Sequence, residues 1–352
     1  MKRLVIDRKA VKINLQTIKE RAGGADIYAD LSGDAYGLGL VETAKLLRDG
    51  GISAFAVSDP KDAAALRREG LTDERIMMLR STADGNEISE LIELGVICTV
   101  GSHDAAVAIN GIAESKKTIC EVQLKIDTGL GRYGFTPEET EKIVSVYKYM
   151  SNLAIVGVFS VFSASWRSRK RMLQQLSVFR GVLDKLTAQG FELGATHICD
   201  SAALFRCEEC RLDAVRVGTA LSGRIPGKSL PGLQKVGYIE AGIEEVNWFP
   251  KGHMVDNRAL RRPAKLAVLS VGYYHGFGAR RREADYSVLD YINNYRKQTY
   301  VRLGSQKARV VGSIGMMHTI IDVTNIECSV GDVVTMDVDP VCVKGLQSQY
   351  IN

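Results

Sequence analysis

Short apolar runs, most of them rich in β-branched residues, recur from about residue 25 to residue 220. Longer stretches lie between these runs, and in them apolar residues return every three or four positions, as on one face of an α-helix. The runs that are typical of strands cover residues 27–31, 54–57, 76–79, 96–100, 122–126, 154–159, 196–199 and 214–217. The helical stretches among them include residues 41–47, 61–68, 87–94, 138–149 and 174–186.

This alternation predicts a parallel α/β architecture. Adjacent parallel strands need a crossover connection, which is usually a helix. Eight strands that alternate with helices over about 200 residues indicate a (β/α)8 TIM barrel. A doubly wound sheet is the competing fold, but it carries a glycine-rich phosphate turn after its first strand. Here the glycine pair at 23–24 precedes the first run, which favours the barrel.

The pattern changes after about residue 230. Strand-like runs follow one another with few helical stretches between them, and turn signals such as Val330-Gly-Asp separate them. The runs cover residues 265–271, 299–303, 308–311, 319–323 and 333–336. We therefore expect a barrel domain over residues 1–230 and a mainly antiparallel β domain over residues 231–352.

Composition and charge exclude several classes of protein. The chain has 352 residues, of which 45% are hydrophobic, and a formal net charge of +5. Basic clusters lie at 166–171 and 280–282, but no aromatic residues are interleaved with them as in a nucleic-acid-binding module. Because no apolar run reaches the length of a membrane span and residues 1–15 are charged, we expect a cytoplasmic chain without nucleic-acid or membrane partners.

The seven cysteines are scattered along the chain and fit reduced thiols better than a disulfide framework. Cys207 and Cys210 form the one close pair. A zinc ribbon needs a second pair at similar spacing, and the sequence has none. The sequence therefore predicts no metal site.

Candidate chemistry gathers where the predicted strands end, which is the end of a β/α barrel that carries active sites. The hydroxyls of Tyr36 and Ser201, with the backbone N–H groups of Gly218 and Thr219 beside an expected helix start, form a candidate phosphate cradle. Arg132 and Arg216 add positive charge to the same mouth. Barrel packing by Tyr36 and pairing of Arg216 with a carboxylate would explain these residues equally well.

Seven short motifs follow one another along the chain. They are Ile6…Asn14, DAYGLG at 34–39, KIDTGLGRYGF at 125–135, His197…Asp200-Ser-Ala-Ala, VRVG at 215–218, GYYHG at 272–276, and VVGSIGM at 310–316 followed by IIDVT at 320–324. In this order they resemble the alanine racemase family, the fold-type III pyridoxal 5′-phosphate (PLP) enzymes. The resemblance covers almost the whole chain and implies PLP chemistry on amino acids in a homodimer whose protomers pair head to tail.

The resemblance assigns the barrel residues to the cofactor. Arg216 matches the arginine that faces the pyridine nitrogen and disfavours its protonation, and His197 matches the histidine that supports this arginine. The residues that match contacts to the cofactor phosphate are Tyr36, Ser201, Gly218, Thr219 and the near-terminal Tyr350.

Other matches concern the substrate. Arg132 matches the arginine near the cofactor's phenolic oxygen and the substrate carboxylate, and Lys125 matches the lysine that, as a carbamate, often steadies that arginine. Tyr273 matches the catalytic tyrosine, which in the family reaches the site from the second domain of the partner chain. Met316 matches a neighbour of this tyrosine.

Ser32 occupies the position of the family's lysine, which holds PLP as a Schiff base and removes the α-proton on one face. A serine hydroxyl forms no imine and is a very poor base near neutral pH. Val161 replaces the histidine that would tune Tyr273, and further departures fall at Ser222, Met317 and Ser348. Among the predicted strand ends, Lys125 is the one lysine that offers a displaced amine.

Three hypotheses follow. The first is a racemase-like protein that has lost alanine racemisation and binds a small ligand: noncovalent PLP, a PLP–amino acid adduct or another phosphorylated compound. The second is an active amino-acid racemase or other PLP enzyme that uses a displaced lysine with Tyr273. The third is a dimeric scaffold protein. The phosphate cradle together with Ser32 favours the first hypothesis.

Overall fold

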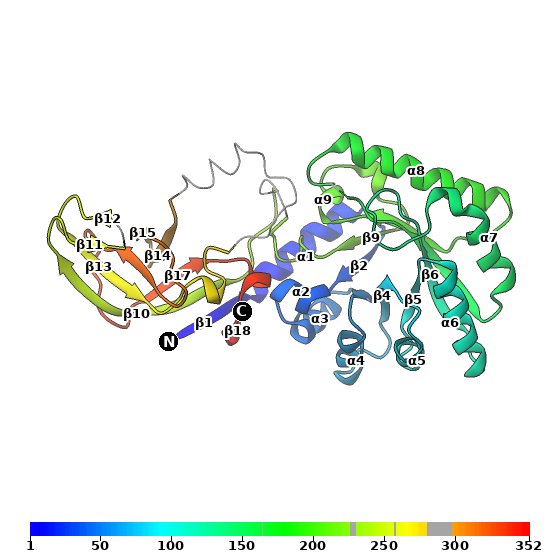
Figure 1. The fold of residues 1–352 in the computed structure, drawn as a ribbon, viewed down its shortest axis with the longest axis horizontal. Coiled ribbons are helices and arrows are strands. Elements are labelled where there is room, and N and C mark those ends of the chain that lie inside the picture. Colours follow the sequence, from blue (N-terminus) through cyan, green and yellow to red (C-terminus); the bar gives the residue numbers. More distant parts are fainter. Residues whose placement is uncertain (164, 226–229, 257, 280–297) are drawn as a thin grey trace. The chain divides into compact units, whose positions relative to one another are not determined.

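The computed structural model describes residues 1–163, 165–225, 230–256, 258–279 and 298–352. It contains two compact units, Ala10–Lys235 and a second unit made of Met1–Lys9 with Val236–Asn352. Figure 1 labels the helices and strands of both units. The basic cluster at 280–282 lies outside the described residues.

The first unit is the predicted barrel. Its eight strands close in the order β2-β3-β4-β5-β6-β7-β8-β9, and all neighbours run parallel, including β2 and β9, where Ile27 lies opposite Val215. Each predicted run coincides with one strand, with small shifts at the ends. The strands are β2 (Asp26–Asp30), β3 (Ala54–Val57), β4 (Arg75–Ser81), β5 (Ile97–Val100), β6 (Cys120–Lys125), β7 (Leu153–Phe159), β8 (Ala195–Cys199) and β9 (Ala214–Val217).

Helices surround the barrel (Figure 1). Their first residues are often capped by a side chain, as at Asp59, Asp84 and Ser168, which accept hydrogen bonds from backbone N–H groups one turn on. Ser168 lies within the basic cluster at 166–171, so this cluster is the start of a helix. The helices are α1 (Arg8–Ala22), α2 (Ser32–Gly37), α3 (Leu40–Asp49), α4 (Pro60–Arg68), α5 (Gly85–Glu93), α6 (His103–Ser115), α7 (Thr140–Tyr149), α8 (Arg169–Ala188) and α9 (Ser201–Leu204), with 3-10 turns η1 (Pro137–Glu139) and η2 (Glu208–Cys210).

The barrel interior is filled by side chains. Tyr28, Met77, Ile97 and Phe159 come from four different strands and form one buried cluster with small residues such as Ala214. Since the interior is packed, a ligand has room only at an end of the barrel.

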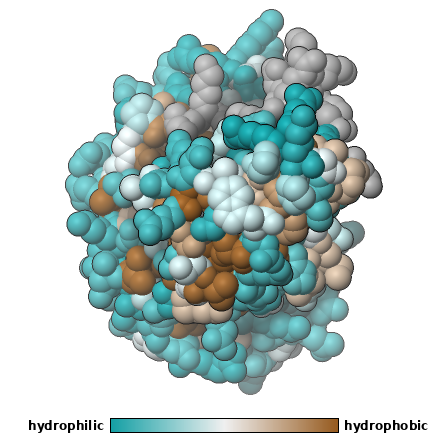
Figure 2. Space-filling view, turned by 90° about the vertical axis from the view of Figure 1, so that its left-hand side faces the viewer, coloured by the Kyte–Doolittle hydropathy of each residue, from teal (hydrophilic) through white to brown (hydrophobic). Residues whose placement is uncertain are grey.

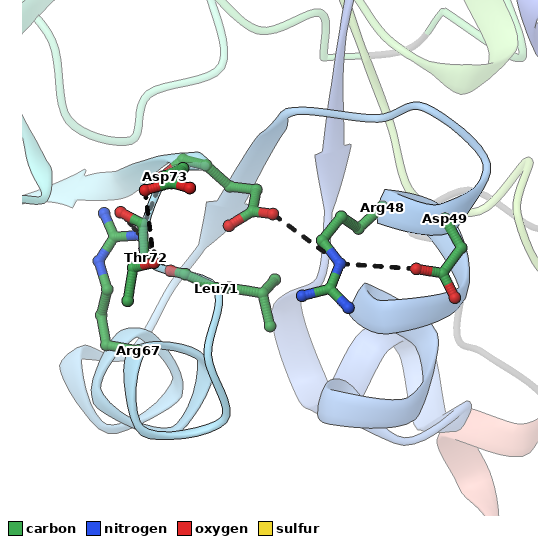
Figure 3. Close-up of polar contacts among 7 residues, drawn as sticks. Arg48, Asp49, Arg67, Leu71, Thr72 and Asp73 are labelled. Carbon is green, nitrogen blue, oxygen red and sulfur yellow. Dashed lines mark hydrogen bonds and ion pairs between the residues drawn. The ribbon is translucent and has the colours of Figure 1, made fainter.

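Polar contacts fasten the end of the barrel where the strands begin (Figure 3). The Arg67 guanidinium donates hydrogen bonds to the carbonyl oxygens of Leu71, Thr72 and Glu74 in the segment that leads from α4 into β4. Arg48 lies 3.6 Å from Asp49 and 3.9 Å from Glu74. These contacts lie at the opposite end from the strand ends that carry the candidate chemistry, so they stabilise the scaffold.

The second unit is a mainly antiparallel sheet of eight strands in the order β13-β16-β15-β14-β17-β10-β1-β18, with a further pairing of β13 with β10. Its one parallel pairing joins β1 to β18, where Ile6 lies opposite Tyr350. The strands are β1 (Lys2–Asp7), β10 (Tyr238–Phe249), β13 (Ala264–Leu269), β14 (Tyr300–Leu303), β15 (Gln306–Val311), β16 (Thr319–Asp322), β17 (Val333–Asp337) and β18 (Ser348–Ile351). A separate hairpin joins β11 (Met254–Val255) to β12 (Arg258–Ala259). The described part of the unit also contains two 3-10 turns, η3 (Tyr273–His275) and η4 (Pro340–Cys342).

The two units do not follow the expected division of the chain into residues 1–230 and 231–352. Strand β1 opens the chain, yet it pairs antiparallel with β10 and parallel with β18, so residues 1–9 belong with the C-terminal sheet. The reason is hydrogen bonding: the backbone N–H and C=O groups of β1 pair with those of β10 on one side and with those of β18 on the other.

One face of the molecule carries apolar surface. Figure 2 views the left-hand side of Figure 1, and there brown apolar side chains gather in the middle of a mostly teal surface. Large exposed side chains of the sheet unit include Trp248, Met254 and Tyr300. In the described part of the chain, no helix has both the length and the apolar character that crossing a membrane requires.

Candidate ligand site at the barrel mouth

Ser32 lies at the mouth, directly after β2, and its hydroxyl is engaged by its neighbours. The Oγ of Ser32 donates to Oδ1 of Asp30 at 2.6 Å, and the backbone N–H of Ser32 donates to the same oxygen at 3.0 Å. The Oγ atoms of Ser32 and Ser58 lie 2.6 Å apart. Ser32 is therefore part of a small polar network around the Asp30 carboxylate.

The segment after Ser32 makes a left-handed turn. Five successive residues have positive φ: Gly33 at 64°, Asp34 at 59°, Ala35 at 54°, Tyr36 at 57° and Gly37 at 79°. For residues other than glycine this conformation costs roughly 1–2 kcal/mol each, so the surrounding structure must enforce it. One such contact is made by Asp34, whose Oδ1 accepts a hydrogen bond from the N–H of Leu40 at 2.7 Å. The turn brings the Tyr36 hydroxyl to 3.2 Å from Oδ2 of Asp30.

The Tyr36 ring lies against the backbone of Gly218. A Cβ atom at position 218 would come within 2.2 Å of Tyr36 Cε2 and 2.8 Å of its hydroxyl oxygen. Only glycine fits here. Ser201 Oγ accepts hydrogen bonds from the N–H groups of Gly218 at 3.0 Å and Ala220 at 3.1 Å. The structure thus brings Tyr36, Ser201 and Gly218 together.

The expected helix start beside Gly218 is absent from the described residues that follow β9. Residues 219–223 form turns, in which the carbonyl oxygen of Thr219 accepts from Ser222 Oγ at 3.0 Å and from the N–H of Arg224 at 3.1 Å. The cradle therefore consists of turn N–H groups and hydroxyls without a helix dipole behind Thr219.

A buried relay of hydrogen bonds holds Arg216. The Arg216 guanidinium lies 3.2 Å from Nδ1 of His197, and Nε2 of His197 lies 2.8 Å from Oε1 of Gln123. The amide nitrogen of Gln123 donates to the Tyr28 hydroxyl at 3.1 Å. Because arginine only donates and Oε1 only accepts, His197 carries its proton on Nε2 and accepts through Nδ1.

His197 is neutral. It is fully buried, with its ring stacked on Tyr28 at 5.2 Å and on Phe159 at 5.1 Å between centroids. Burial, and then the charge of Arg216, hold the pKa of His197 well below its ordinary value. Burial also lowers the pKa of Arg216, against the opposing charges of Asp30 and Asp200.

Lys125 ends β6 and is almost fully buried, with 3% of its surface exposed. Its Nζ lies over the rings of Tyr133 at 5.2 Å and Phe159 at 5.6 Å. Burial, then the charges of Arg216 and Arg132, lower the pKa of Lys125 to about 8. About a tenth of this amine is therefore unprotonated at pH 7, and about half of it at pH 8. Arg132 is exposed and acts on Lys125 through its charge.

A cavity of about 370 Å³ lies among the loops that follow β4, β5 and β6. Residues of the Lys125–Phe135 loop line one wall, among them Asp127, Tyr133 and Gly134. The Asp127 carboxylate folds this loop by accepting hydrogen bonds from the N–H groups of Gly129, Leu130 and Gly131.

Two carboxylates at the mouth were not singled out from the sequence. Asp30 is the last residue of β2, and Asp200 caps α9 by accepting from the N–H groups of Ala202 and Ala203. Burial raises the pKa of Asp200, although Ser165 donates to it at 2.6 Å. A carboxylate within the otherwise apolar run 27–31 is the signal that would have drawn attention to Asp30.

The sheet unit holds the other expected site residues. Tyr273 begins the 3-10 turn η3, and its N–H donates to the carbonyl oxygen of Gly315 at 2.9 Å, beside Met316. Tyr273 is 58% exposed and Met316 is 56% exposed. Tyr350 lies in β18, where the guanidinium of Arg8 sits 5.3 Å from its ring centroid.

The side chains at the positions where the sequence departs from the family motifs make ordinary structural contacts. Val161 packs against the buried cluster of the barrel. Ser222 is fully buried and bonds to the backbone, and Ser348 begins β18. Val161 and Ser222 therefore contribute to packing and backbone hydrogen bonding, and Ser348 to a strand.

The donor set of the mouth suits a phosphorylated ligand. Tyr36 and Ser201 provide hydroxyls, and Gly218 admits the Tyr36 ring because a Cβ at this position would collide with it. Arg216 adds a buried cation in contact with His197. These residues fit the phosphate and ring of PLP, whereas Ser32 offers no amine to its aldehyde.

Comparisons with known proteins agree with this geometry. Residues 6–226 match the family model "Alanine racemase, N-terminal domain", and residues 238–343 match "Alanine racemase, C-terminal domain". The alanine racemase of Clostridium tetani is 30% identical over 342 residues, which cover 94% of this chain and 84% of that protein. The alanine racemase of Halothermothrix orenii is 30% identical over 340 residues, which cover 94% of this chain and 86% of that protein.

Solved structures share the fold. The structure of alanine racemase from Streptomyces lavendulae is 24% identical and superposes with a TM-score of 0.88 over 100% of this chain and 97% of that one. The alanine racemase of Bacillus anthracis with bound L-Ala-P is 20% identical, with a TM-score of 0.83 over 100% of this chain and 95% of that one.

Proposed function

Because this chain belongs to the alanine racemase family, we propose that it keeps a pocket for PLP or another phosphorylated small ligand but no longer carries out ordinary alanine racemisation. One observation carries the proposal: the side chain at position 32 is a serine whose hydroxyl is bound to Asp30 and Ser58. This group cannot bond to an aldehyde as an amine does, and it is a very poor base.

Noncovalent binding rests on the phosphate cradle. Tyr36, Ser201 and the N–H group of Thr219 would hold the phosphate beside Gly218, whose own N–H donates to Ser201, and Arg216 would face the pyridine nitrogen. Hydrogen bonds to a charged group contribute about 1.5–3 kcal/mol each, so several of them support binding without a covalent bond. When bound, PLP supplies an aldehyde and an electron-withdrawing ring. Without a lysine at position 32, these groups have no covalent anchor there.

The test is a titration of the purified protein with PLP, followed by borohydride reduction and mass measurement. We expect a saturable change in PLP absorbance that dialysis reverses, and no pyridoxyl label after reduction. Absence of any saturable change would refute noncovalent binding of PLP. A label on a lysine would show that an amine elsewhere in the chain has replaced the missing one.

Lys125 supports a second candidate function, an active PLP enzyme with a displaced amine. It is a buried lysine at the end of β6, and its pKa is lowered to about 8, which leaves much of it neutral and nucleophilic near pH 8. Peptide mapping of the reduced protein separates the two functions. A pyridoxyl label on Lys125, absent from Lys125→Met and accompanied by turnover of an amino acid, would favour the enzyme.

We also propose a head-to-tail homodimer. Its support is the exposure of Tyr273, Tyr274 and Met316 on adjoining segments of the sheet unit, since exposed large side chains that lie together are typical of protein interfaces. By the resemblance, these residues would complete the mouth of the partner chain.

A further inference from the structure

We infer that the mouth selects a phosphorylated ligand that carries its own protonated amine, and that Asp30 is the residue that receives this amine. The inference rests on the proposed function, because it names the chemistry of the ligand that the cradle would hold.

Asp30 is a carboxylate held in place by neutral groups. Its Oδ1 accepts two hydrogen bonds from Ser32, at 2.6 and 3.0 Å, and its Oδ2 accepts one from Tyr36 at 3.2 Å. Among the residues that the structure describes, no ion pair joins Asp30 to a lysine or arginine, and the buried Arg216 acts on it only through its charge. Two carboxylate oxygens accept about four hydrogen bonds, so Oδ2 has capacity for a further donor.

The position of Asp30 sets what that donor must be. A half-buried carboxylate is stabilised most by a charged donor, since charge-assisted hydrogen bonds are about twice as strong as neutral ones. The aldehyde oxygen of PLP has no proton to donate. Like the Asp30 carboxylate it is a hydrogen-bond acceptor, so the two groups would repel each other. A protonated amine on the ligand provides both a positive charge and N–H donors.

Tyr36 ties the carboxylate to the cradle. Its hydroxyl reaches Asp30, and its ring lies against Gly218, whose N–H bonds to Ser201. The Tyr36 side chain thus contacts both the Asp30 carboxylate and the phosphate cradle. A ligand that binds both must carry its amine only a few atoms from its phosphate. Pyridoxamine 5′-phosphate meets this requirement, because its aminomethyl and phosphomethyl arms stand on neighbouring ring carbons.

The experiment is a calorimetric titration of the full chain with pyridoxamine 5′-phosphate, PLP, pyridoxine 5′-phosphate and inorganic phosphate. We expect pyridoxamine 5′-phosphate to bind about tenfold or more tightly than pyridoxine 5′-phosphate, which has a neutral hydroxymethyl arm, as one charged hydrogen bond implies. Asp30→Asn should remove this preference, so that the variant binds the amine and hydroxyl ligands within about threefold of each other.

Asp49→Asn is the matched control, because it makes the same chemical change at the opposite end of the barrel, and it should keep the preference. Equal binding of the amine and hydroxyl ligands to the unaltered chain would overturn the inference while the proposed function stands. Retained preference in a folded Asp30→Asn variant would also overturn it. If neither inorganic phosphate nor any pyridoxyl phosphate binds, the proposed function itself fails.

Discussion

At the scale of single residues, two neighbours at the end of β2, Asp30 and Ser32, determine the polar chemistry of this part of the mouth. A lysine at position 32 would bring an amine and a positive charge, whereas the observed pair brings a hydroxyl and a negative charge. The cradle residues around them stay in contact with one another. Placing a lysine at position 32 therefore tests whether the cradle can hold PLP next to this position.

Ser32→Lys should create a covalent attachment point for PLP. The new amine would replace a hydroxyl that already lies within the polar network of the mouth, where the cofactor aldehyde is expected. Borohydride reduction and peptide mapping should find a pyridoxyl label on residue 32. Ser58→Lys, at the neighbouring hydroxyl, is the control and should remain unlabelled; label on neither lysine would place the cofactor elsewhere.

Lys125 makes stability depend on pH. Its pKa is about 8 in the folded chain and near 10.5 when exposed, so between these values the unfolded chain binds more protons. The free energy of unfolding should therefore rise as the pH increases from 8 to 10.5, by up to about 3 kcal/mol from this group. Urea unfolding at several pH values should show this rise in the unaltered chain and a smaller one in Lys125→Met. Equal slopes would contradict a depressed pKa.

At the scale of elements, the left-handed turn after β2 and the turn after β9 form one cradle because Gly218 lets the Tyr36 ring approach. Gly218→Ala should displace that ring, lower the free energy of unfolding by about 1–3 kcal/mol and weaken the binding of pyridoxyl phosphates. Thermal unfolding and calorimetry measure the two effects.

Gly181→Ala provides the control for this prediction. Gly181 lies within helix α8, where an added Cβ would meet no atom within 4 Å, so alanine should raise helix stability by up to about 1 kcal/mol. Ligand affinity should stay unchanged. If Gly218→Ala binds ligand as tightly as Gly181→Ala, the close approach of Tyr36 has no part in binding.

The elements themselves were largely predictable from the sequence. Strands such as β3 and β9 are buried along their whole length, so their continuous apolar runs marked them without tertiary information. Helix α6 was not among the expected helices. Strands β1 and β10 escaped notice because charged residues interrupt them and their pairing joins distant parts of the chain.

The site was predictable to a smaller extent. Motif order placed Tyr36, Ser201 and Gly218 at strand ends, and the barrel then brings them together. Gln123 has no such signal, since its role depends on facing His197 across the barrel interior. The left-handed turn also lay beyond sequence reasoning, because three of its five residues are not glycine.

At the scale of the whole molecule, the exposed side chains of Tyr273, Tyr274 and Met316 on adjoining segments argue for assembly. Sedimentation analysis should give a particle of twice the 38.5 kDa chain. Met316→Glu should shift the equilibrium toward monomer, since a charge inside an apolar contact is unfavourable. Met254→Glu is matched to it because both methionines are 56% exposed, and it should leave the mass unchanged. A monomeric unaltered chain would remove the basis for a shared mouth.

The relay from Arg216 through His197 and Gln123 to Tyr28 has an electrical consequence. Every link donates in the same direction, away from the mouth, so its dipoles align and present their acceptor end to the guanidinium. Because these acceptor ends face the guanidinium, the row stabilises a fixed positive pole, the charge of Arg216, at the base of the pocket. Any bound molecule would lie between this fixed pole and the acidic rim at Asp30.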